Sequence, residues 1–273
     1  MRINALLPLA VLLVACSPSG SSPGEAGASM TRPPAEFAGP SSRTTSTILE
    51  SYARAWRGAG EFELRAPTIL GIWVDGEGFS VELTNHGARF SEGAPGRFDW
   101  GFETDRATLL RLEEGSLNVL TAMGQARGSD PIPFRLRLPE GLSGDAEFRR
   151  NYLPVILRFW SREWPEAIYF GEGTTRPVHG ANVTALLYGE RIRTAWYQLK
   201  PGMHVNADPA DQANDFDTAI IVTRGRFSGK LDGVERSFSE GEMVLVPAGM
   251  THEFFASEDE YGEFVILMWG ENA

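Results

Sequence analysis

Two histidines and the polar residues near them are the side chains of this sequence best suited to chemistry. His204 begins the triplet His204-Val205-Asn206, and His252 follows further along the chain. Asp215 and Asp217 lie between them. Imidazole and carboxylate groups together bind first-row transition metals, so two histidines and one carboxylate could hold iron or manganese. Asn206 could add a neutral oxygen.

The segment around His252 has a recognisable spacing. It reads Gly241-Glu-Met-Val-Leu-Val-Pro247-Ala-Gly249-Met-Thr-His252, which resembles the second signature motif of cupins. Gly241 permits a turn, Pro247 and Gly249 turn the next corner, and His252 leads a strand inward. Two strands with an Asp-Gly hairpin at 231–233 precede the motif, and residues 264–269 supply a last strand. The resemblance implies an all-β cupin barrel over residues 175–273.

Metal-binding cupins show a His-x-His pair, a Glu seven residues before a Gly, and the histidine of the second motif. Only His204 and His252 match this pattern, because Asn206 replaces one histidine and Thr218 lies seven residues before Gly225. The predicted metal ligands are therefore His204, Asn206 and His252, with Asp215 or Asp217 as the carboxylate. The ion would be a divalent transition metal, Fe, Mn, Ni or Zn.

A metal-free site is the alternative interpretation. His204, Asn206 and His252 would then form hydrogen bonds to a small ligand in the mouth of the barrel. We expect His86, in a predicted turn, to be solvated. His179 could face the barrel, although we favour a surface position for it.

Residues 45–165 alternate between strand and helix patterns, which predicts an α+β unit. Thr47 and Glu50 fit a capping box for a first helix, and Asp105 and Gly115 fit the two ends of another. The stretches FSVELTNHGARFSEG and FDWGFETDRATLLRLEEGSLNVLTAMGQARG resemble a sterol-carrier-protein-2 (SCP2) type domain. That resemblance implies a lipid-binding tunnel. Its predicted wall includes Trp100, Phe102, Met123 and Trp160; the alternative is that these side chains fill a closed core.

The N-terminus resembles that of a bacterial lipoprotein. An apolar stretch after Arg2 ends in Leu13-Val14-Ala15-Cys16 and is too short to span a bilayer. The resemblance implies a signal peptide at 1–15, cleavage before Cys16, and a diacylglycerol (with palmitate as an acyl chain) on its thiol. Residues 16–44 are rich in Ser, Gly and Pro, which predicts a flexible, disordered linker. We expect a lipid-anchored protein of the cell envelope, on the outer membrane facing the periplasm in a Gram-negative cell.

Composition narrows the class of partner. The chain has 273 residues, a formal net charge of −11 and no basic run, which argues against nucleic acid. The leading hypothesis is an envelope protein that binds a hydrophobic or small ligand. A metal-dependent cupin enzyme (oxygenase, isomerase or lyase) is one alternative, and a non-catalytic module that forms a homodimer through exposed strand edges is another.

Overall fold

The computed structural model describes residues 42–58, 64, 66–125, 130–142, 146–162, 166–271 and 273. The predicted signal peptide, Cys16 and most of the predicted linker lie outside the described residues. Among the described residues, no helix is long and apolar enough to cross a membrane.

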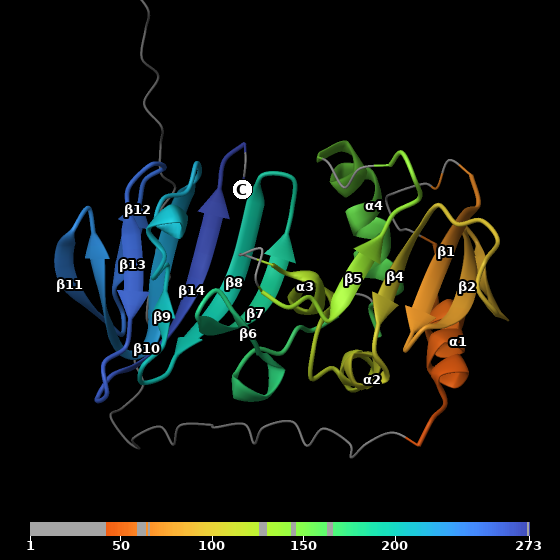
Figure 1. Cartoon of the computed structure of the whole chain (residues 1–273), viewed down its shortest axis with the longest axis horizontal. Helices are drawn as coiled ribbons and strands as arrows, with labels where there is room; N and C mark the ends of the chain where they lie inside the picture. The colour runs from red at the N-terminus through yellow and green to blue at the C-terminus, as the bar shows by residue number, and fades with distance from the viewer. Residues whose placement is uncertain are drawn as a thin grey trace, which may run out of the picture. The chain divides into compact units, whose positions relative to one another are not determined.

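The N-terminal part is a mixed five-stranded sheet with four helices (Figure 1). Its elements are α1 (Thr45–Ala55), β1 (Thr68–Val74), β2 (Glu77–Thr84), β3 (Gly87–Glu92), β4 (Trp100–Thr104), α2 (Arg106–Glu114), α3 (Val119–Met123), β5 (Phe134–Arg137) and α4 (Ala146–Phe159). The strand order is β3-β2-β1-β4-β5, and β1 and β4 run parallel whereas the other pairs are antiparallel. This arrangement is the α+β architecture that the sequence predicts.

Local hydrogen bonds explain where the helices begin and end. Asp105 accepts a hydrogen bond from the backbone N–H of Thr108 and caps α2, while Gly115 ends it in the left-handed region. Both residues were predicted in these roles. The cap predicted at Thr47 is wrong, because Thr44 is the N-cap of α1 and accepts from the N–H of Thr47.

The aromatic residues predicted to line a tunnel lie mainly in the core of this part. Trp100 and Phe102 are fully buried, and the Phe102 ring lies 4.6 Å from Phe134 and 5.8 Å from Trp160 between centroids. Met123 is partly buried against the same cluster. The structure thus places Trp100 and Phe102 in a closed core. Alternation along a strand predicts burial, but it cannot tell a packed core from a cavity wall.

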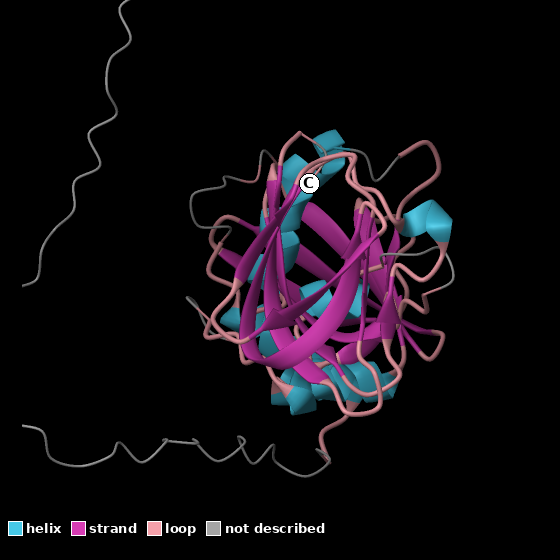
Figure 2. Cartoon of the chain, turned by 90° about the vertical axis from the view of Figure 1, so that its left-hand side faces the viewer, coloured by secondary structure: helices cyan, strands magenta, loops and turns pink. Residues whose placement is uncertain are grey.

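The C-terminal part is an antiparallel sheet, which confirms the all-β architecture predicted for residues 175–273. Its elements are the short 3-10 helix η1 (Glu172–Thr174), β6 (Arg176–Val178), β7 (Ala181–Tyr188), β8 (Ile192–Leu199), β9 (His204–Val205), the 3-10 helix η2 (Pro209–Asp211), β10 (Asp217–Leu231), β11 (Val234–Ser239), β12 (Met243–Val246), β13 (His252–Phe255) and β14 (Tyr261–Trp269). The order is β6-β7-β8-β14-β10-β13-β9, with β11 and β12 also paired to β10. We call this unit the C-terminal sheet (Figure 2).

The long strand β10 holds the C-terminal sheet together. Its first half pairs with β14 and β12, and its second half pairs with β11, β13 and the start of β14. Gly225 lies between the halves at φ +69°, and a Cβ there would come within 2.1 Å of the carbonyl oxygen of Tyr261. Only glycine fits such a position. The sheet can therefore bend at this point.

Hydrogen bonds join the N-terminal part to β6 and β7. Arg176 is buried and donates to the carbonyl oxygens of Thr121 at 2.6 Å and Pro131 at 2.8 Å. Asn118 donates to the carbonyl oxygen of Ala185, and the N–H of Ala185 donates to the hydroxyl of Thr121. These bonds satisfy polar groups that packing has removed from water.

We predict that Arg176→Met destabilises the protein by about 3 kcal/mol, because two buried carbonyl oxygens lose a charged donor. Arg54→Met is the control: Arg54 is exposed and forms an exposed i,i+4 ion pair with Glu50, so its loss should cost about 0.5 kcal/mol or less. Denaturant unfolding monitored by tryptophan fluorescence measures both. Equal losses would contradict a joining role for Arg176.

Candidate functional site

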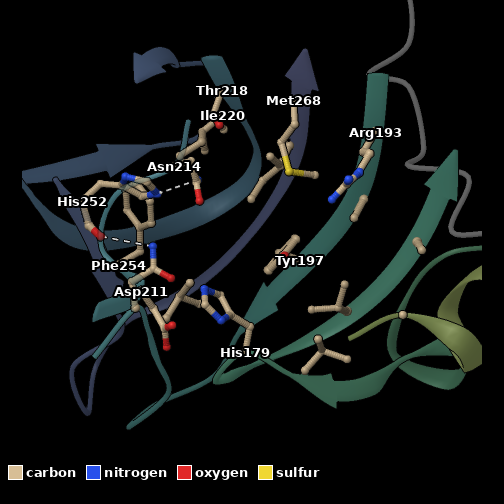
Figure 3. Close-up of a pocket in the computed structure, with 18 of the residues that line it drawn as sticks. His179, Arg193, Tyr197, Asp211, Asn214, Thr218, Ile220, His252, Phe254 and Met268 are labelled. Atoms are coloured by element: carbon tan, nitrogen blue, oxygen red, sulfur yellow. Dashed lines mark hydrogen bonds between the residues drawn. The ribbon is translucent and has the colours of Figure 1, made fainter. Parts of the chain in front are cut away.

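A cavity of about 330 Å³ lies on the concave side of the C-terminal sheet. Several strands contribute to it, so the sheet must curve around the space they share. The apolar part of the wall includes Val183, Val205, Ile220, Phe254, Ile266 and Met268. The polar part includes His179, Tyr188, Arg193, Tyr197, Asn206, Asp211, Asn214, Thr218 and His252 (Figure 3). The wall thus combines apolar side chains with several polar groups, which are the groups that fix the orientation of a ligand in a small-molecule site.

The ring of His252 presents a lone pair to the cavity. His252 is only 6% exposed, and its Nδ1 lies 3.0 Å from the carbonyl oxygen of Met250. A carbonyl oxygen only accepts hydrogen bonds, so Nδ1 carries the proton and Nε2 is an acceptor. The described partner of Nε2 is the side-chain amide of Asn214, and at 3.4 Å this contact is long. Burial also lowers the pKa of His252 below 6.5, which keeps the ring neutral near pH 7.

Asn206 and Thr218 each bring to the cavity wall a buried polar atom that has no hydrogen-bond partner among the described residues. Asn206 is 2% exposed and uses its Nδ2 to donate to the carbonyl oxygen of His252, which leaves Oδ1 without a partner. Thr218 is 4% exposed and its hydroxyl has none. Buried polar groups are nearly always hydrogen-bonded in folded proteins. Two such atoms on one cavity wall therefore indicate a place for a ligand.

Arg193 is the positively charged residue of this wall. Its guanidinium lies 5.7 Å from the ring centroid of Tyr188, and Figure 3 shows it directed toward the cavity. Burial raises the pKa of the Tyr188 and Tyr197 hydroxyls. Both phenols are therefore neutral, and the cavity wall carries the charged side chains Arg193 and Asp211.

The structure corrects the predicted role of His204. Along β13, His252 and Phe254 point inward while Glu253 and Phe255 point outward, because side chains alternate on a strand. The Nε2 of His204 lies 2.8 Å from Glu253 Oε2, and its ring packs against Phe255. His204 therefore lies on the outer face and cannot share a ligand with His252. Asn206 has a left-handed backbone conformation, at φ +57°, so its side chain does not point to the same face as that of His204.

The predicted carboxylate ligands also lie elsewhere. Asp217 accepts a hydrogen bond from the N–H of Ala248 at 3.0 Å, and Asp215 is exposed. Neither belongs to the cavity wall. Among the described residues, no three His, Cys, Asp or Glu side chains come together as a metal site. The donors on the wall thus do not fit the Fe, Mn, Ni or Zn site that the sequence predicts.

Sequence reasoning missed several wall residues. His179, which we expected at the surface, lines the cavity with Asp211 and Asn214, whereas His86 is exposed as expected. Asp211 and Asn214 lie between strands, where no periodicity assigns a direction. Both faces of β8 carry apolar residues, so alternation does not predict which face, and hence whether Arg193, belongs to the cavity. Only the tertiary structure shows which face is concave.

Comparison with known proteins gives cupins among the similar structures. No protein-family model and no curated protein matches the sequence. The chain is similar to a Cupin 2 conserved barrel domain protein from Salinispora arenicola, with 18% identity over 38% of this chain and 91% of that chain, at a TM-score of 0.32. It is also similar to a cupin-like protein from Thermotoga maritima, with 19% identity over 33% and 68% of the two chains, at a TM-score of 0.30.

A third similar structure is the polyketide cyclase RemF from Streptomyces resistomycificus, with 16% identity and a TM-score of 0.30. The match covers 33% of this chain and 65% of RemF, slightly less than two thirds of its length.

The lowered pKa of His252 predicts a pH dependence of stability. The unfolded chain binds this proton near pH 6.5 and the folded protein only at lower pH. Between these two pKa values the unfolded state holds more protons, so stability falls as pH falls through that window, by about 1.4 kcal/mol per pH unit at most. Above about pH 6.5 the contribution is constant.

Urea unfolding from about pH 8 to about pH 5 measures this slope. We expect His252→Gln to remove it, while the carboxylates contribute equally to both proteins. An identical pH profile for the two proteins would show that His252 is not protonated more readily on unfolding.

Proposed function

We propose that the C-terminal sheet binds a small organic molecule in the cavity beside His252, Asn206 and Thr218. The observation that supports this most directly is the pair of buried, unpartnered polar atoms on one wall, Asn206 Oδ1 and Thr218 Oγ1. Leaving such an atom unpaired costs about 1–3 kcal/mol. A ligand that donates hydrogen bonds to them recovers part of that free energy.

The wall also indicates the chemical class of the ligand. The oxygen of Asn206 is an acceptor without a described partner, and the Nε2 of His252 has only the long contact with Asn214, so both can accept from N–H or O–H donors of a ligand. Met268 pairs with Thr218 on one side and with Arg193 on the other, so the three residues lie in one row across the sheet. Two strand spacings place the backbones of Arg193 and Thr218 about 10 Å apart. We therefore propose a ligand with hydrogen-bond donors at one end, an apolar middle, and a carboxylate or other acidic group facing Arg193.

One observation favours acid–base catalysis as a second candidate function. His252 is neutral, its Nδ1–H is held by Met250, and its Nε2 is directed to the cavity. A general base needs this arrangement. Mass spectrometry of a bound molecule incubated with the parent protein and with His252→Gln would test it: a product formed only by the parent supports catalysis, and an unchanged molecule supports binding alone.

The lipid anchor is a separate proposal, supported by the apolar stretch that ends at Cys16. The hydrophobic ligand expected of the N-terminal part likewise stays a prediction. An apolar groove of about 250 Å³ beside Trp160, with Leu112, Leu120 and Leu157, is the space this part offers for it.

We predict that Thr218→Val stabilises the ligand-free protein by about 1 kcal/mol, because it removes a buried hydroxyl that has no partner. The same change should weaken binding of a hydroxylated ligand about tenfold. Thermal unfolding measures the first effect. Calorimetric titration with meta-hydroxybenzoate and with benzoate measures the second, since these probes differ only in the donor.

Thr184→Val is the matched control. Thr184 is a buried threonine of the same sheet, but its hydroxyl bonds to Thr174, so its removal should destabilise the protein by about 1–2 kcal/mol and leave binding unchanged. If Thr218→Val destabilises the protein as much as Thr184→Val does, its hydroxyl has a partner and the ligand argument fails. If native mass spectrometry finds no bound molecule and neither meta-hydroxybenzoate nor benzoate raises the melting temperature, the proposed function fails.

We predict that Cys16→Ser abolishes incorporation of labelled palmitate and moves the protein from the membrane fraction to the soluble fraction, because a serine hydroxyl does not replace the acylated thiol. Labelling of cells that express the full chain, followed by fractionation, measures both. Thr31→Ser, in the same predicted linker, is the control and should retain the label. Labelled Cys16→Ser protein would contradict the lipoprotein interpretation.

A further inference from the structure

A groove separate from the cavity lies where the N-terminal part meets β7. Leu112 of α2, Leu120 of α3, and Leu157 and Trp160 at the end of α4 line it together with Leu187 of β7. We call it the seam groove, and its volume is about 250 Å³. None of the described residues that line it belongs to the wall of the cavity. The two hollows are therefore distinct.

The seam groove is open to solvent at an apolar rim. Ile168, Tyr169 and Leu187 line the groove and are 38%, 41% and 45% exposed. Leu117 and Leu120, which also line it, are only 2% and 4% exposed. The groove thus combines an accessible rim with a buried apolar floor, so a molecule from solution can enter it.

Trp160 brings a buried hydrogen-bond donor without a partner to this wall. Its side chain is 4% exposed, and its Nε1 has no hydrogen-bond partner among the described residues. The ring centroid lies 5.0 Å from that of Phe134, which has no acceptor atom, and 5.1 Å from that of Tyr52, whose hydroxyl also has no partner. An indole N–H can only donate. Because an unpaired buried donor is unfavourable, a ligand with an acceptor would recover part of that free energy.

The other polar side chains of the wall have partners or reach solvent. Asn118 donates to a backbone carbonyl oxygen of β7 at 2.8 Å, and Ser161 donates to one of α4 at 2.7 Å. Arg162 and Glu166 form an ion pair at 2.6 Å, so their charges offset each other. The buried side-chain donor that is left for a ligand, within the described part of the chain, is Nε1 of Trp160.

We infer that the seam groove binds a compact, uncharged, largely apolar molecule with one hydrogen-bond acceptor, such as an aromatic ketone. An apolar protein cavity of about 150 Å³ holds benzene. A groove of about 250 Å³ therefore suits a benzene-sized ring with a short substituent. The ligand class rests on the proposal above that the N-terminal part binds a hydrophobic molecule, and it is independent of the ligand of the cavity.

A fatty acid is the competing occupant, and the charges of the groove argue against it. Its carboxylate would leave water for an apolar surrounding, which is costly without a charged partner. Arg162 is already paired with Glu166, and the Glu166 carboxylate would repel a second one. An uncharged acceptor avoids both costs and still meets the donor of Trp160.

Titration with two matched probes tests the inference. Acetophenone carries the acceptor, and α-methylstyrene has a methylene group in place of the carbonyl oxygen. The protein is the full chain with Cys16→Ser, so that no acyl chain competes for the groove. We expect Trp160→Phe to weaken acetophenone binding about tenfold and to change α-methylstyrene binding by about twofold or less, because only acetophenone uses the N–H.

Trp56→Phe is the matched control. Trp56 is 2% exposed, and its Nε1 donates to the carbonyl oxygen of Thr84 at 2.7 Å, so it is a buried tryptophan with a partner outside the groove. We expect this change to leave the binding of both probes unaltered. Circular dichroism confirms that each variant is folded.

Nuclear magnetic resonance of the isotope-labelled indole nitrogens locates the bound probe. The chain has seven tryptophans, and the indole N–H signal that Trp160→Phe removes belongs to Trp160. We expect acetophenone to move this signal downfield by more than α-methylstyrene does. Equal weakening of both probes by Trp160→Phe, or tighter binding of decanoate than of acetophenone at this signal, would overturn the ligand class and leave a hydrophobic site. If none of the three probes moves the signal, the hydrophobic ligand proposed for the N-terminal part fails as well.

Discussion

The curvature of the C-terminal sheet is the constraint on which the rest of the site depends. Strand β10 pairs with four other strands, and its register against β14 shifts between Val222 and Arg224, just before Gly225, where a side chain would collide with the backbone of Tyr261. The sheet has one face toward the cavity and one face away from it. Every residue of the neighbouring strands then belongs to one face or the other, since side chains alternate along a strand.

That division explains why residues close in sequence have different tasks. His252 and Phe254 help to line the cavity, whereas the intervening Glu253 is hydrogen-bonded to His204 and forms an ion pair with Lys230 outside it. The concave face accepts a cost in stability, because Asn206 and Thr218 keep polar atoms without partners there. A site adapted for binding can carry such a cost, and a face that served only packing would gain from apolar side chains at these positions.

The N-terminal part supports this sheet from its β6–β7 side. Hydrogen bonds connect α3 and its N-cap in the N-terminal part to β6 and β7 of the sheet, and they involve Arg176, Asn118 and Thr121. Gly124 and Gln125, which follow α3, also border the cavity. The α+β part therefore contributes directly to the surroundings of the site, in addition to enclosing a core of its own.

The sequence by itself determined the local features that depend on neighbouring residues. Asp105 and Gly115 fixed the ends of α2, the Asp-Gly pair fixed the β10–β11 turn, and the spacing from Gly241 to Pro247 fixed the strand that leads to His252. These signals are readable because turns and caps use hydrogen bonds and backbone angles within a few residues.

Only the tertiary structure decided which residues meet. The pairing of His204 with Phe255 places His204 on the outer face, away from His252, and the pairings of β8, β14 and β10 bring Arg193 and Thr218 to the cavity that His252 also lines. It also placed Trp100 and Phe102 in a closed core and left Leu245 exposed. Alternating residues along a strand predict that it has two faces. The direction in which the sheet curves decides which face encloses a site. That direction is set by pairings between residues far apart in the chain.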